Sequence, residues 1–249
     1  MHKYEESEKM YIDAKYITEK AMGKENLLYA GILNDLAVLY KNTHQYDKSE
    51  LLYKESLIIT ENILGKEHER YASMIDNLAI FYFDIGKYDQ AVPLHLESIK
   101  IYEKTIGKYN HDYISALNNL SVTYEAQGKY PESDTLIIEW FQLNLSRLIG
   151  SISFLSEQEL EQYVQMLAKY GNRLSNYLQK RYVKTAHLGN LLQINYDDAL
   201  LQKGFLLSAS NQLNTLASTS PVADSLFTLL KSYRRSLAKA YSEPIDRRE

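Results

Sequence analysis

The side chains best suited to catalysis or metal binding are few in this chain and stand far apart. Its six histidines form no His-Glu-x-x-His pair, and the absence of cysteine excludes a thiol nucleophile and a thiolate metal site. The glycines are too scattered for a Gly-x-Gly-x-x-Gly motif, and no phosphate-binding Gly-x4-Gly-Lys loop is present. We therefore predict no catalytic residue, no metal site and no cofactor.

Two histidines, His68 and His111, stand at nearly matching positions of what reads as the same loop in two copies. A metal site would need several such ligands to converge. A loop contact or a helix cap is the simpler role, and we predict it for both. Adjacent acidic residues such as Asp197 and Asp198 point about 100° apart on a helix, so they do not share a site.

Composition describes a folded protein rather than a disordered or membrane-spanning one. The 249 residues are 45% hydrophobic and 24% charged, with a net charge of −4 and only four prolines, so long helices are permitted. No apolar run has the length of a membrane span and no signal peptide opens the chain, which predicts a cytoplasmic protein. Nucleic acid is a minor alternative that rests on a few basic residues near the C-terminus: Arg234, Arg235, Lys239, Arg247 and Arg248.

The strongest internal match lies at a shift of 42 residues. Four sets of identical residues recur at that spacing: Tyr4, Tyr46, Tyr88 and Tyr130; Gly23, Gly65 and Gly107; Leu36, Leu78 and Leu120; Tyr40, Tyr82 and Tyr124. Agreement of several sets on one period is the signature of a repeat architecture.

Each repeat predicts two helices. Apolar residues recur three and four positions apart, as in Leu33, Leu36 and Tyr40, which is the stripe of an amphipathic helix that we name helix A. A polar break follows helix A, and two copies have glycine there. Glycine suits a helix end because it enters the left-handed conformation without strain. Helix B then runs from the repeating tyrosine to the repeating glycine. A small residue three positions after the tyrosine lets helix A approach closely: Ser49, Ala91 and Ser133.

The helix A segments LNDLAVLY, IDNLAIFY and LNNLSVTY, together with the 42-residue period, resemble the tetratricopeptide repeats of kinesin light chains and their bacterial relatives. The resemblance covers residues 1–150 and implies an all-α fold, a right-handed tetratricopeptide superhelix. Trp140 departs from the pattern at a usually small position and is expected to mark the end of the regular array. The first copy contains only helix B, from which we expect that earlier repeats have been removed and that residues 4–22 expose an apolar face.

Residues 151–249 lose the period but keep helical patterning, with helices expected over 156–181, 194–216 and 220–241. The segments FLSEQE, YDDALLQKGFLLSAS and LLKSYRRSLAKAYSEPIDRRE resemble the helical linker that precedes CHAT domains, the caspase-like peptidase domains of bacteria. That resemblance implies a longer protein whose catalytic histidine and cysteine lie downstream, so none of them is assigned to a position here. We therefore predict superhelical repeats continued by longer packed helices, without enzymatic activity in the chain itself.

The tetratricopeptide resemblance also implies a groove lined by one face of each helix A, where a protein or extended peptide would bind. Nine positions fall on that face: Asn34, Val38, Lys41, Asp76, Ile80, Phe83, Asn118, Val122 and Glu125. A second polar row, Asp35, Asn77 and Asn119, is expected to tie neighbouring repeats together, and most of the 22 tyrosines to pack in the core. Two alternatives stay open: a clamp on the protein's own peptidase domain, and a nucleic-acid or ribonucleoprotein sensor.

Overall fold

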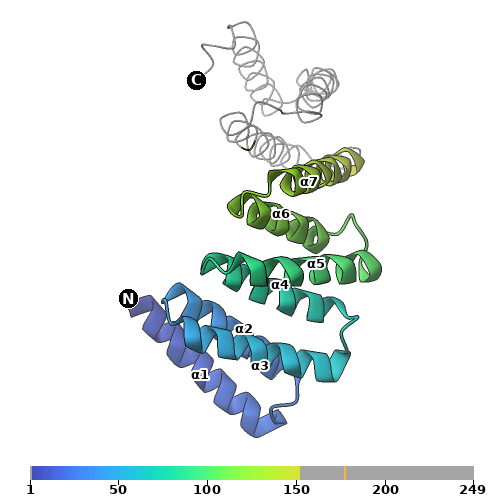
Figure 1. Ribbon diagram of the computed structural model, residues 1–249. Coiled ribbons are helices and arrows are strands. Elements are labelled where there is room, and N and C mark those ends of the chain that lie inside the picture. The colour runs from blue at the N-terminus through green and yellow to red at the C-terminus, as the bar shows by residue number, and fades with distance from the viewer. Residues whose placement is uncertain (1, 152–176, 178–249) are drawn as a thin grey trace, which may run out of the picture. The chain divides into compact units, whose positions relative to one another are not determined.

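The computed structural model describes residues 2–151 and Tyr177, and every element within residues 2–151 is an α-helix. The seven helices follow one another through short turns: α1 His2–Met22, α2 Leu27–Asn42, α3 Tyr46–Leu64, α4 Glu69–Asp84, α5 Tyr88–Thr105, α6 His111–Ala126 and α7 Tyr130–Ser151. Figure 1 shows consecutive helices running antiparallel and stacking along the array. Helix A of the repeat is α2, α4 and α6, and helix B is α1, α3, α5 and α7. The all-α solenoid predicted from the 42-residue period is confirmed.

Each helix A begins at a side-chain cap. The Oδ1 atoms of Asn26 and Asn110 accept hydrogen bonds from backbone N–H groups of the first turn, at 2.8 Å in both cases. At the same register His68 uses Nδ1 instead, which accepts from the N–H of Arg70 at 3.0 Å. The predicted capping role of His68 is confirmed. His111 is the first residue of α6, and the cap there is Asn110.

The turns from helix A to helix B use the left-handed backbone region. Gly86 and Gly128 have φ angles of 76° and 74°, which confirms the predicted role of glycine at this break. In the first complete repeat the same position is His44, with φ of 61°. A residue with a Cβ is strained in this region, so His44 stores strain that glycine avoids in the other two copies.

Small residues let the two helices of a repeat pack closely. Ser49 is fully buried, and its hydroxyl donates to the carbonyl oxygen of Ala37 across the α2–α3 interface at 2.8 Å. Ser133 makes the same bond to the carbonyl of Ser121 at 2.9 Å. The predicted close approach is confirmed for these two serines, and in α5 the equivalent residue is Ala91, which is fully buried.

Aromatic residues pack in the core between the helices alongside leucine, isoleucine and alanine. Phe81 and Tyr53 are buried with their ring centroids 5.6 Å apart, and they join α4 to α3 of the preceding repeat. The repeating tyrosines that open helix A are also buried: Tyr29, Tyr71 and Tyr113. Packing is therefore the role of these tyrosines, whereas Tyr16 and Tyr109 are exposed.

The chain divides into two units, Met1–Asn144 and Leu145–Glu249. The helices predicted over 156–181, 194–216 and 220–241, and the segment that resembles the CHAT linker, lie outside the described residues. Trp140 is buried near the end of the first unit. Within the described part of the chain, no helix combines the length and the apolar character needed to cross a membrane.

Candidate functional site

The nine predicted groove residues all lie on α2, α4 or α6, but they differ in how far they reach solvent. Asn34 and Asp76 keep only 8% and 9% of their surface exposed. The other seven are partly exposed: Val38, Lys41, Ile80, Phe83, Asn118, Val122 and Glu125. We call these seven residues the helix-A face. That they contact a partner stays a prediction.

Asn34 and Asp76 are buried because the following repeat binds them. The Nδ2 group of Asn77 donates to Oδ1 of Asn34 at 3.0 Å, and Nδ2 of Asn119 donates to Oδ2 of Asp76 at 3.2 Å. In both cases donor and acceptor are 43 residues apart, one more than the repeat. The two polar rows that the sequence suggested are therefore halves of a single ladder between repeats. The predicted tying role of Asn77 and Asn119 is confirmed, whereas Asp35 is exposed.

The next acceptor of the ladder is Asn118. Its Oδ1 atom is buried and accepts no hydrogen bond within the described residues. The position 43 residues further along the chain is outside those residues. Asn118 thus differs from Asn34 and Asp76, because its buried acceptor has no hydrogen-bond partner within the described residues although the residue as a whole is partly exposed.

Two apolar members of the helix-A face pack against the core while remaining partly exposed. Val38 and Phe83 pack against the cluster that contains Ala37, Phe81 and Tyr82. The ring of Phe83 also lies 5.6 Å from that of Tyr88 at the start of α5. Such side chains hold their conformation before a partner arrives, which lowers the entropy cost of binding.

Lys41, the one cation among the nine residues, is paired. Its Nζ lies 2.7 Å from Oδ2 of Asp84 in the following repeat. This pair again spans 43 residues, like the amide ladder. Lys41 therefore links repeats as well as bordering the helix-A face, and its charge is matched by a carboxylate.

A buried histidine was missed in the sequence. His95 on α5 is fully buried, with Nδ1 2.7 Å from Oδ1 of Asp76, and Ser98 Oγ lies 3.4 Å from the same oxygen. Serine, histidine and aspartate are thus close together, yet burial keeps any substrate away from them. The sequence contained a signal for this contact. In one repeat Asp76 stands where the other repeats have asparagine, and in that same repeat His95 stands where the preceding repeat has Tyr53.

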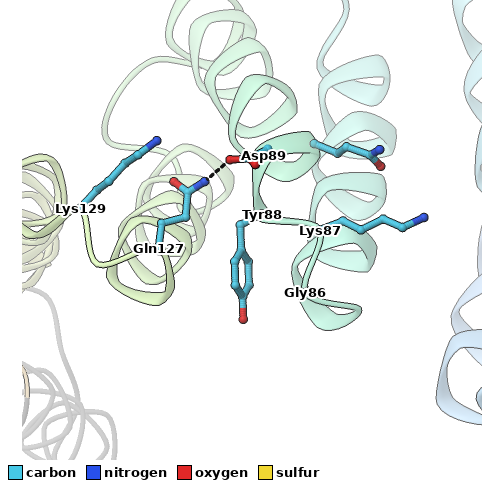
Figure 2. A pocket seen from close by; sticks show the side chains of 7 residues that line it. Gly86, Lys87, Tyr88, Asp89, Gln127 and Lys129 are labelled. Atoms are coloured by element: carbon cyan, nitrogen blue, oxygen red, sulfur yellow. Dashed lines mark hydrogen bonds between the residues drawn. The ribbon is translucent and has the colours of Figure 1, made fainter.

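A hollow of about 430 Å³ opens between two A-to-B turns. It lies between residues 86–90 and the turn that contains Gln127 and Lys129. Figure 2 shows Gln127 reaching Asp89, and the Nε2–Oδ1 distance is 2.7 Å. Lys129 lies with its Nζ 5.9 Å from the ring centre of Tyr124. The side chains in this hollow mainly connect two turns of successive repeats.

Metal ligation has no support in the described part of the chain, where no group of three or more histidine and acidic side chains converges. The surface that remains as a candidate site within the described residues is the helix-A face.

Comparisons with known proteins agree with this geometry. The family model described as tetratricopeptide repeat matches residues 29–95 and 70–136. The crystal structure of BtubC (BKLC) from P. vanneervenii is similar, with a TM-score of 0.54 and 20% sequence identity over 58% of this chain and 58% of that one. This chain therefore spans less than two thirds of the length of BtubC.

Two further crystal structures are of a Podosopora anserina protein described as a kinesin light chain with nearly identical TPR-like repeats. One, a variant, has a TM-score of 0.54 and 20% identity over 80% of this chain and 89% of that one. The other has a TM-score of 0.52 and 17% identity over 80% and 88%. A search of curated proteins finds no match to the sequence. Residues 29–136 thus carry tetratricopeptide repeats, and the structural similarity extends the assignment to the solenoid fold.

Proposed function

We propose that the array is a protein-interaction scaffold whose helix-A face holds an extended segment of a partner protein. The observation that carries the proposal is the recurrence of partly exposed apolar residues at equivalent places on successive A helices: Val38, Ile80 and Val122. An extended chain meets such equivalent positions one after another, whereas a compact small molecule would reach only one repeat.

The residues of the helix-A face differ in the kind of contact that they can make with a partner. Ile80, Phe83 and Val122 supply apolar contact area, because they are partly exposed and their backbone is fixed in helices. Asn118 adds a partly exposed amide side chain to the same face. Asn34 and Asp76 are buried and accept hydrogen bonds from the following repeat, so their role is to hold neighbouring repeats together.

The proposal is tested by placing a photo-crosslinking amino acid at Val122 and, as a control, at Leu96. Leu96 is 47% exposed on α5 and does not belong to the helix-A face. We expect a protein partner to be crosslinked from position 122 and not from position 96. Equal crosslinking from both positions would contradict a site on the helix-A face.

The captured partner is then measured with the Phe83→Ala and Asn118→Ala variants, together with their thermal stability. Removal of one central contact at an interface commonly costs about 1–3 kcal/mol of binding, and we expect a loss on that scale with the array still folded. Leu96→Ala is the matched control. Unchanged affinity in both folded variants would place the partner elsewhere.

A narrower form of the proposal makes this scaffold the sensor part of a larger CHAT peptidase in the bacterial cytoplasm. It is supported by the resemblance of residues 150–249 to the segment that precedes such domains. The parental reading frame tests it, since the peptidase needs a histidine and a cysteine in a following α/β segment. If such a domain exists, it can be added to this chain as a separate protein. An intramolecular clamp would bind the added domain without any other partner, and this binding would distinguish a clamp from a sensor.

A further inference from the structure

The apolar residues of the helix-A face form a narrow row across the array. Val38, Ile80 and Val122 are partly exposed, and each stands at the same position of its helix, 42 residues from the next. We call these three residues the apolar row. Three positions before them, on the same side of each helix, stand polar residues: Asp35, Asn77 and Asn119. Three positions after them stand Lys41, Phe83 and Glu125, of which only Phe83 is apolar. The row is therefore one apolar side chain wide except at Phe83.

The distance between members of the apolar row follows from the packing of the A helices. Helix α4 contacts α2 directly, since Asn77 donates to Asn34 across the two helices at 3.0 Å. Helix α6 contacts α4 in the same way, through the bond from Asn119 to Asp76 at 3.2 Å. The axes of packed helices lie about 8–10 Å apart. Successive members of the row, which occupy equivalent positions, are therefore separated by roughly that distance.

The polyproline II conformation of a peptide backbone has a repeat that fits this distance. It has about three residues per turn and rises about 3.1 Å per residue, so side chains three positions apart point the same way and lie roughly 9 Å apart. In a β-strand the side chains on one face lie only about 6.6–6.8 Å apart. A strand therefore places its side chains at a shorter spacing than the row, and polyproline II matches it.

An α-helix also has a suitable repeat, because the same side returns after about seven residues, or roughly 10.5 Å. The helix-A face is too narrow for it. An amphipathic helix presents an apolar stripe of about three to four residues in every two turns. Against this face, much of that stripe would lie on the polar residues that border the apolar row, such as Asp35 and Asn77.

The polar border of the row offers hydrogen-bonding groups to a backbone that has none satisfied internally. Asn77 and Asn119 are partly exposed, and each donates through Nδ2 to the preceding repeat, which holds the amide in one orientation. Their Oδ1 atoms accept no hydrogen bond within the described part of the chain. The backbone groups of polyproline II make no bonds within the segment, so they remain available to these amides, whereas those of an α-helix are already paired.

We propose that the helix-A face binds a partner segment in the polyproline II conformation that carries an apolar side chain at every third position. Successive apolar side chains contact Val38, Ile80 and Val122, and proline or polar residues fill the positions between them. Proline suits those positions because its ring fixes φ near the value of this conformation, which lowers the entropy cost of binding. This inference rests on the proposed function and adds the conformation and the sequence pattern of the bound segment.

The probes are three phage-displayed peptide libraries of equal length, selected on the full chain. They have apolar residues at every second, every third or every seventh position, and random polar residues or proline elsewhere. We expect enrichment from the library with the three-residue spacing. Ile80→Asp should weaken binding of the selected peptides by at least about tenfold, the scale of a lost hot spot. Leu51→Asp is the matched control, because Leu51 is 69% exposed on α3, outside the helix-A face.

Val122→Thr provides a second variant that keeps the shape of the side chain, and circular dichroism checks that all variants are folded. It should also weaken binding, because it places a hydroxyl in the apolar row. The conformation of the peptide is tested by placing proline or glycine at the positions between its apolar residues. Proline should strengthen binding and glycine should weaken it. The opposite order would contradict polyproline II, because proline interrupts both a helix and a strand.

The failure of this inference differs from the failure of the proposed function. Selected peptides that bind Ile80→Asp and Leu51→Asp equally well would place the site elsewhere and contradict the proposed function itself. Peptides that depend on Ile80 but come from the library with two-residue or seven-residue spacing would leave the proposed function standing and overturn polyproline II. The absence of enrichment from every library would overturn the inference as well.

Discussion

His95 Nδ1 lies 2.7 Å from Oδ1 of Asp76, with both side chains buried at the α4–α5 interface. The second carboxylate oxygen of Asp76 accepts from Asn119 in the following repeat. One carboxylate therefore joins the two helices of its own repeat and also the next repeat. His95 Nε2 is buried with no hydrogen-bond partner in the described residues, so Asp76 provides the contact that His95 depends on.

Replacing Asp76 by alanine should destabilise the array. The change leaves the buried ring nitrogen of His95 without its partner, at a cost of about 1–3 kcal/mol for such a group, and removes the bond from the partly exposed Asn119. Urea denaturation followed by circular dichroism measures the loss. Asp35→Ala is the control, because Asp35 is the exposed neighbour of the matching position in α2. Equal stability of the two variants would show that the buried carboxylate contributes nothing.

His44→Gly should stabilise the array by about 0.5–1 kcal/mol, because glycine relieves the strain of φ at 61°. His44 Nδ1 is 2.7 Å from the hydroxyl of Tyr46, a contact that the change removes, but both groups are exposed. The matched reverse change is Gly86→Ala, which should destabilise although the added Cβ meets no atom within 4 Å. Thermal melting of both variants checks the prediction, and a lower melting temperature for His44→Gly would refute it.

Val92→Glu should add a hydrogen bond that two other repeats already have. Tyr40 donates to Glu8 and Tyr82 donates to Glu50, each pair 32 residues apart, while the equivalent of Glu50 beside Tyr124 is Val92. A carboxylate there would accept from Tyr124, for a gain of about 0.5–1.5 kcal/mol. The same change in a Tyr124→Phe background should give no gain, and an equal gain in both backgrounds would exclude this bond as the cause.

The contribution of Glu50 to stability should depend on pH. Hydrogen bonds from Lys54 and Tyr82 hold the pKa of Glu50 below its ordinary value of 4.5 in the folded state. Because the folded pKa is the lower one, this contribution is fully present above pH 4.5 and is lost as the pH falls below it. The stability difference between the protein and its Glu50→Gln variant should therefore shrink below that pH. A difference that stays constant down to pH 3, well below that ordinary value, would contradict this account.

The repeat made the fold predictable from the sequence. Residues 42 apart share one environment, so the pattern of Leu36, Leu78 and Leu120 identified helix A, and the recurring glycines located the turns. Helix ends followed from local chemistry, since a cap bonds to backbone within its own first turn. The capping role of His68 could therefore be predicted from the sequence.

The candidate site was less predictable, because its contacts depend on distances between repeats. Comparing residues 42 apart shows which positions are equivalent, but the bond from Asn77 reaches a residue 43 positions earlier. The sequence therefore listed Asn34 beside Phe83 as groove residues, although Asn34 is buried by its neighbour and Phe83 is partly exposed. The pairing of His95 with Asp76 needed the rotation of α5 against α4, which no single helix pattern encodes.

The ladder between repeats bears on how such a chain can grow. The bonds from Asn77 to Asn34 and from Asn119 to Asp76 have the same donor group and equivalent acceptors. Duplication of one whole 42-residue unit inside the gene would place each new amide donor beside an equivalent hydrogen-bond acceptor. An array of this kind can therefore lengthen in a single genetic event. An insertion of one residue within a helix would shift every later side chain of that helix by about 100°. Evolution of the array should therefore proceed by whole units, with length changes between relatives in multiples of the repeat.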